Sequence, residues 1–236
     1  MTRKKPPGII RVMTFGDSQT HGAGVDVADS YSAVAELALG ERWEVINAAV
    51  SGFRSLNVYR YIKRHIEQYQ PDVLVIDCMS WDSERDNGTI ISPPDSVHGF
   101  RRFFWNSRLY YTLRFIREKS RIDRPRWLDK DPHYRPDGHF RFGNHDLILE
   151  WGKERGIEVV FMSYPVMHVD RVNCMTKNSE LPPGSPIVPA CETLSRSGHP
   201  VQELFLDNNH MTVLGNRLVG QALARTLKSL EPRLRR

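Results

Sequence analysis

The sequence predicts a three-layer α/β/α sandwich with a central, mainly parallel sheet of about five strands, in a flavodoxin-like arrangement. Segments with strand-like and helix-like patterns alternate along the chain. The strand-like segments are nearly continuous apolar runs, which is typical of strands covered on both faces of a sheet. The length of 236 residues and the 40% hydrophobic content suit one domain of this class. We expect residues 1–8 to form a flexible tail and residues 9–232 to form a single domain.

The first half of the chain contains three predicted strands and two predicted helices. Apolar runs indicate strands over residues 9–14, 43–50 and 72–78. The third run is rich in β-branched residues and is the clearest strand of the chain. Apolar residues at a spacing of three or four predict helices over residues 30–40 and 55–70. Each predicted strand is therefore followed by a helix or by a turn.

The second half is less regular. Aromatic residues at helical spacing predict a helix over residues 99–119, and prolines among charges predict an irregular excursion at about 120–140. Such an excursion often overhangs the site of an α/β domain. The remaining predicted elements are a helix over 144–155, a strand over 157–163, a short strand at 187–188 within a loop-rich stretch, 164–200, and a helix from 213 to about 230.

The formal net charge is +5, and much of the excess lies in arginines and lysines between residues 101 and 126. These basic residues alternate with aromatic ones, which is a weak sign of nucleic-acid binding. We favour an amphipathic helix with a solvated basic face, and therefore expect no nucleic-acid partner. No apolar stretch is long enough to span a membrane and no signal peptide is apparent, so the sequence predicts a cytoplasmic protein. The oligomeric state stays open.

The chain has three cysteines, Cys78, Cys174 and Cys191, and none has zinc-ligand spacing with another. Three cysteines do not make a disulfide framework in a chain of this length. Cys174 and Cys191 could meet in the late loop-rich region, but for a cytoplasmic protein we favour unpaired thiols. The sequence indicates no metal site and no cofactor.

Three residues suggest nucleophilic catalysis. Ser18 directly follows the first predicted strand, where a hydroxyl can face a cleft at the edge of the sheet. Asp207 and His210 near the C-terminus could supply a carboxylate and a base, which a serine needs to become a nucleophile. His21 lies in a glycine-rich loop and His145 in a predicted helix, where surface or packing roles are expected. His210 is therefore the preferred base.

The residues Gly16-Asp17-Ser18, Asn47 to Gly52 and Asp207-Asn208-Asn209-His210 occur in the order found in SGNH, or GDSL-type, serine hydrolases. The chain resembles this family over nearly its whole length. The resemblance implies that Ser18 is the nucleophile, that His210 is the base and that Asp207 orients it. It also implies an oxyanion hole with backbone amides of Ser18 and Gly52 as donors.

The family's third motif has an asparagine whose amide is a further oxyanion donor, and here the sequence departs from the family. Trp81 occupies that position in one alignment and Asp82 in an alignment shifted by one residue. Trp81 could donate through its indole N–H, whereas an ionised Asp82 would repel an oxyanion. Asn87 and Asn144 are alternative donors that the sequence cannot place.

The resemblance implies a serine esterase that acts through an acyl-enzyme on Ser18. The expected partner is a small-molecule or glycan ester, such as an acetylated sugar or a short acyl ester. Two alternatives stay open. The first is an acyltransferase that uses the same three residues, and the second is a binding module that has kept the fold but turns over poorly because the third donor is missing.

Overall fold

A computed structural model describes residues 4–77, 143–175 and 181–234 of the chain. The predicted helix over 99–119 and the excursion at about 120–140 lie outside these residues. Within them, five strands form a parallel sheet in the order β2-β1-β3-β4-β7. These strands are β1 (Ile10–Gly16), β2 (Trp43–Asn47), β3 (Val73–Asp77), β4 (Glu158–Met162) and β7 (Ile187–Val188).

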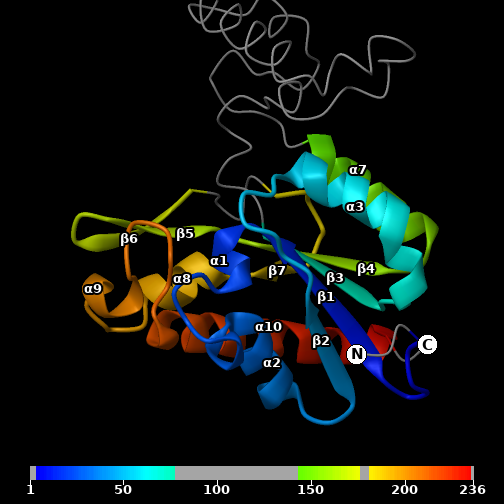
Figure 1. The fold of residues 1–236 in the computed structure, drawn as a ribbon, viewed down its shortest axis with the longest axis horizontal. Coiled ribbons are helices and arrows are strands. Elements are labelled where there is room, and N and C mark those ends of the chain that lie inside the picture. The colour runs from blue at the N-terminus through cyan, green and yellow to red at the C-terminus, as the bar shows by residue number, and fades with distance from the viewer. Residues whose placement is uncertain (1–3, 78–142, 176–180, 235–236) are drawn as a thin grey trace, which may run out of the picture. The chain divides into compact units, whose positions relative to one another are not determined.

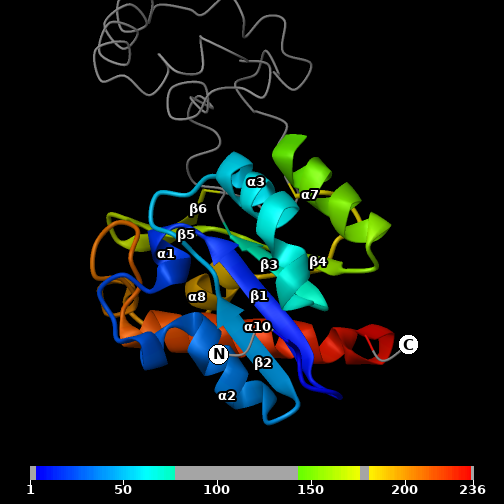
Figure 2. The same cartoon turned by 45° about the vertical axis from the view of Figure 1, so that its right-hand side comes forward.

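Helices cover both faces of the sheet, as Figures 1 and 2 show. One face packs against α3 (Ser55–His65) and α7 (Gly143–Glu154), and the other against α2 (Tyr31–Leu39), α8 (Ala190–Ser195) and α10 (Val213–Leu234). The predicted three-layer α/β/α sandwich with a parallel sheet is therefore confirmed.

Strand β3 illustrates how the sequence builds the two cores. Val73 and Val75 belong to the apolar cluster that includes α2 and α10, whereas Leu74 and Ile76 belong to the cluster that includes α3 and α7. All four side chains are fully buried. Because successive side chains of a strand point to opposite faces, a continuous apolar run fills both cores at once.

The strand order reverses between β1 and β3, because β2 lies on one side of β1 and all later strands of the sheet lie on the other. Ligands of open α/β sheets bind at such a switch point, beyond the carboxyl ends of the strands. The chain leaves β1 at this point and enters the single-turn helix α1 (Ser18–His21). The fold therefore puts Ser18 where a site is expected.

Several predicted boundaries differ from the structure. The second strand ends at Asn47 rather than at residue 50, and the predicted helix over 55–70 is divided into α3 and the 3₁₀ turn η2 (Ile66–Tyr69). The stretch 164–200 is more regular than predicted. It contains an antiparallel hairpin of β5 (Pro165–His168) and β6 (Arg171–Cys174), and helix α8. Two further short elements are η1 (Val27–Asp29) and α9 (Val201–Leu204).

Candidate active site

Ser18 is the first residue of α1 and is partly exposed. The preceding Asp17 caps the helix, since its side chain accepts a hydrogen bond from the backbone N–H of Gln19 at 2.9 Å. Gly16 lets the chain turn here, because a Cβ atom at this residue would lie 1.9 Å from Thr20 Oγ1 and 2.2 Å from the carbonyl oxygen of Asp77. The Gly-Asp-Ser sequence thus forms a tight strand-to-helix turn with Ser18 at its tip.

The structure brings Ser18, His210 and Asp207 together. His210 Nε2 lies 2.9 Å from Ser18 Oγ, and His210 Nδ1 lies 2.7 Å from Asp207 Oδ2. The two ring nitrogens thus face a hydroxyl and a carboxylate, which is the arrangement in which a histidine can take a proton from a serine. Of the other two histidines considered, His21 is exposed at the end of α1, and His145 is buried with its ring edge-on to Phe161.

Hydrogen bonds between its own residues hold the loop that carries Asp207 and His210. Asp207 Oδ1 accepts hydrogen bonds from the backbone N–H groups of Asn209 and His210, both at 2.8 Å, and Leu206 N–H donates to His210 O at 2.7 Å. Partial burial raises the pKa of the Asp207 carboxyl, but the hydrogen bonds from the His210 ring and from the two amides outweigh it and lower the pKa to about 2. Asp207 is therefore ionised at neutral pH.

The segment that follows β2 approaches the same turn. Val50 N–H donates to Gly16 O at 3.3 Å, and Asn47 Nδ2 donates to the carbonyl oxygen of Thr20 in α1 at 2.8 Å. Gly52 follows with a φ of 80°, which favours glycine, and its amide makes no hydrogen bond to any residue that the structure describes. The amide of Ser18 also has no intrahelical partner, because Ser18 is the first residue of its helix.

The remaining candidates for the oxyanion hole are not placed by the structure. Trp81, Asp82 and Asn87 lie outside the described residues. Asn144 belongs to α7, and its side chain is likewise outside the description. The third donor therefore stays a sequence-based prediction.

A buried polar cluster, which the sequence analysis missed, includes Asp17 and Thr20 on either side of Ser18 in the chain. Thr20 Oγ1 donates to Asp77 Oδ2 at 2.9 Å, and Tyr31 OH lies 2.9 Å from Thr20 Oγ1 and 3.2 Å from the same carboxyl oxygen. Tyr164 OH donates to Asp17 Oδ2 at 2.9 Å. All of these side chains are buried. The only signal in the sequence is an aspartate at the end of the most apolar strand.

The Asp77 carboxyl has a strongly perturbed pKa. Burial raises the pKa, the nearby Asp17 carboxylate raises it further, and the hydroxyls of Thr20 and Tyr31 lower it only in part, so the result is a pKa of about 8. Asp77 Oδ1 makes no hydrogen bond within the described residues. Asp77 is therefore mostly protonated at neutral pH.

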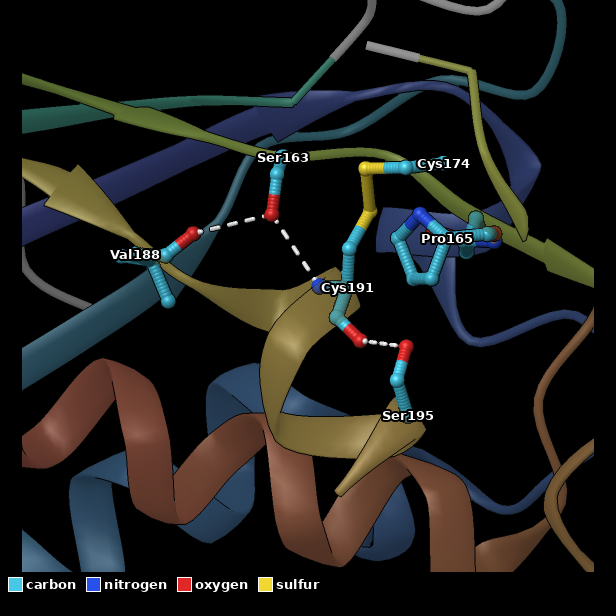
Figure 3. Close-up of a disulfide and its surroundings, with 7 residues drawn as sticks. Ser163, Pro165, Cys174, Val188, Cys191 and Ser195 are labelled. Carbon is cyan, nitrogen blue, oxygen red and sulfur yellow. Dashed lines mark hydrogen bonds between the residues drawn. A yellow bond between two sulfur atoms is a disulfide. The ribbon is translucent and has the colours of Figure 1, made fainter. Parts of the chain in front are cut away.

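Cys174 of β6 and Cys191 of α8 form a disulfide, with an S–S distance of 2.02 Å (Figure 3). The expectation of unpaired thiols is therefore wrong for this pair. It failed because sequence spacing alone could not show that the β5–β6 hairpin returns β6 to the start of α8. Disulfides are typical of oxidising compartments, so the bond weighs against the predicted cytoplasmic location, which stays untested.

The described residues hold neither a metal site nor a membrane-spanning helix. No group of three or more histidine, cysteine, aspartate or glutamate side chains in this part of the chain is arranged to hold a metal ion. Among the helices that the structure describes, none is long and apolar enough to cross a bilayer.

Comparisons by sequence match no family model and no curated protein. Comparison of structures finds many solved relatives. A protein placed in the G-D-S-L lipolytic family, from Desulfitobacterium hafniense, is 14% identical, with 92% of this chain and 98% of that chain covered and a TM-score of 0.56. A catalytic mutant of an acetylxylan esterase from Geobacillus stearothermophilus is also 14% identical, with 92% of this chain and 94% of that chain covered and a TM-score of 0.55. An aryl esterase from M. smegmatis is 17% identical, with 94% of this chain and 99% of that chain covered and a TM-score of 0.51.

These likenesses cover nearly all of this chain and of each relative, and at such low identity they show the fold alone. The chain has the SGNH, or GDSL-type, hydrolase fold that its sequence resembles.

Proposed function

We propose that this protein is a serine esterase that hydrolyses a carboxylic ester through an acyl-enzyme on Ser18. The observation that carries the proposal is the chain of contacts from Ser18 Oγ to His210 Nε2, 2.9 Å, and from His210 Nδ1 to Asp207 Oδ2, 2.7 Å. A hydroxyl, an imidazole and an ionised carboxylate in this order form the apparatus of nucleophilic acyl transfer.

Acylation begins when Ser18 Oγ attacks the ester carbonyl carbon while His210 Nε2 takes the hydroxyl proton. The resulting imidazolium is stabilised by Asp207, whose low pKa keeps it ionised over the working range of pH. Collapse of the tetrahedral intermediate breaks the bond to the alcohol oxygen, and the imidazolium donates its proton to that oxygen. The acyl group is then bonded to Ser18 and the alcohol is free to leave.

Deacylation repeats these steps with water as the nucleophile. His210 takes a proton from the water, and the water oxygen adds to the acyl carbon. The bond from the acyl carbon to Ser18 Oγ then breaks, and the imidazolium returns its proton to Ser18 Oγ. The negative charge that develops on the carbonyl oxygen in both halves needs fixed donors. The amides of Ser18 and Gly52 are our candidates for two of them, and Trp81 or Asp82 stands where the family has its third.

Two relatives of the same fold suggest the substrate class. One is an acetylxylan esterase and the other an aryl esterase. We therefore propose an acetylated sugar or a short acyl ester as the substrate. The two relatives differ in the alcohol part of the ester, so a panel that varies acyl and alcohol parts separately is the direct way to find the specificity.

The test is covalent labelling with a fluorophosphonate, which reacts readily only with an activated serine. The wild-type protein should be labelled, Ser18→Ala should not be, and Ser229→Ala, a change at an exposed serine of α10, should be labelled like the wild type. Absence of labelling in the wild type would contradict the proposal and favour a binding module. Hydrolysis of p-nitrophenyl acetate, with and without an added alcohol, then separates an esterase from an acyltransferase.

A further inference from the structure

Gln19, the residue after Ser18, is almost fully buried, with 2% of its surface exposed. Its side-chain Nε2 donates to the carbonyl oxygen of Pro165 at 2.9 Å and to that of Asn209 at 2.5 Å. Both partners are carbonyl oxygens, which only accept, so the nitrogen of the amide must face them. One side chain therefore bonds to two segments that lie 146 and 190 residues away in the sequence.

The two acceptors belong to the parts of the chain that must be kept in register with Ser18. Asn209 directly precedes His210, and Pro165 begins β5. Strand β5 in turn bonds to the same loop, because Met167 N–H donates to Asn208 O at 2.8 Å. The hydrogen bonds of Asp207, described above, lie within the loop and fix its shape. The bonds of Gln19 instead tie the loop and β5 to α1.

The side-chain oxygen of Gln19, unlike its nitrogen, has no partner among the described residues. This Oε1 atom is buried, and an unsatisfied buried acceptor destabilises a protein. The G-D-S-L family is named for a motif that has leucine at this position, where this chain has glutamine. An apolar residue would avoid the buried acceptor but would leave the carbonyl oxygens of Pro165 and Asn209 without this donor, so what the glutamine adds is the pair of bonds that joins α1 to β5 and to the loop of His210.

We propose that Gln19 is a positioning residue, which holds the loop of Asp207 and His210 at hydrogen-bonding distance from Ser18. The inference rests on the proposed function, because it assigns Gln19 a role in placing the general base. It acts through His210 and makes no contact with the reacting atoms. Loss of its two bonds should let the base move relative to the nucleophile, and a displacement of about 1 Å in such a site lowers turnover about 100-fold.

The first experiment uses Gln19→Met, which keeps the length of the side chain and removes both the donor and the acceptor of the amide. We expect kcat for a p-nitrophenyl ester to fall about 10-fold to 100-fold, with KM changed less than about 3-fold. Gln221→Met, at an exposed site of α10, is the matched control and should equal the wild type. Equal kcat values for Gln19→Met and the wild type would overturn the proposal.

A double-mutant cycle separates positioning from general damage. In a His210→Ala background the base is absent, so Gln19→Met should cause little further loss of the residual rate. A loss of the same size in both backgrounds would mean that Gln19 acts through the fold and not through His210. The fluorophosphonate result with Ser18→Ala is independent of this cycle, so failure of the proposed function and failure of this inference give different outcomes.

Hydrogen–deuterium exchange tests the same proposal without any substrate. Gln19→Met should speed exchange in peptides that cover residues 205–211 and 165–168, while the strands of the sheet and α10 stay as protected as in the wild type. Unchanged exchange of the loop would overturn the inference even if activity fell.

Discussion

Asp77 offers a quantitative test of the buried polar cluster. Its pKa is about 8 in the folded protein, whereas an ordinary aspartate has a pKa of 3.8. Between these two values of pH the folded state keeps a proton that the unfolded state has lost. Stability therefore falls as pH rises through this window, by up to about 1.4 kcal/mol per pH unit, and levels off above pH 8.

Asp77→Asn removes this dependence while keeping the hydrogen bonds. The amide oxygen can accept from Thr20 and Tyr31 as Oδ2 does, and the amide, like the protonated carboxyl, carries no charge. The variant should thus gain stability relative to the wild type as pH increases. From pH 5 to pH 7 the difference in free energy of unfolding should grow by about 3 kcal/mol, as an upper bound.

The assay is urea unfolding followed by circular dichroism at each pH unit from 4 to 9, with the disulfide intact. Titration of all other groups is shared by variant and wild type, so it cancels in the difference. Asp26→Asn, at an exposed aspartate before η1, controls for the loss of one carboxylate. If the difference between Asp77→Asn and the wild type were the same at every pH, Asp77 would be ionised throughout, and our account of the cluster would be wrong.

Three further predictions concern other parts of the molecule. Reducing the bond between Cys174 and Cys191, which closes a loop with a sequence separation of 17, should lower the free energy of unfolding by about 3 kcal/mol; an unchanged denaturation midpoint after reduction would contradict this. Trp81→Asn should raise kcat more than it changes KM if the third oxyanion donor is missing, and a slower variant would show that another donor is present. Prolonged EDTA treatment should leave esterase activity unchanged, because the proposed steps use only side chains and backbone amides of this chain and a water molecule; loss restored by a divalent ion would refute this.

The parallel sheet was predictable because each strand is a local signal. The apolar run over residues 72–78 reads as a buried strand by itself, and β3 occupies Val73–Asp77 of it. The end of the second strand was not predictable in the same way. Residues 48–50 are apolar, and Val50 N–H still bonds to Gly16, the last residue of β1, but the strand ends at Asn47 and the Val50 side chain is exposed, so the apolar run continues past the strand without filling the core.

The β5–β6 hairpin was missed because its turn carries no sequence signal. Tight hairpins usually have glycine or asparagine where the backbone needs a positive φ. Here Val169, a β-branched residue, adopts a φ of 56° between the two strands. The hairpin pairs Pro165 with Cys174, and this pairing brings the disulfide and the acceptor of Gln19 to the same place.

The candidate catalytic residues could be found from the sequence because a known family preserves their order. The parts played by Gln19 and Asp77 could not be found in this way, because their hydrogen-bond partners are brought to them only by the fold. The acceptors of Gln19 lie on β5 and in the loop that carries His210, and the hydroxyls that face Asp77 come from α1 and α2. Both residues lie in or beside the same strand-to-helix turn. The two variants therefore test different dependences: Gln19→Met tests the placement of His210 relative to Ser18, and Asp77→Asn tests the stability of the buried cluster.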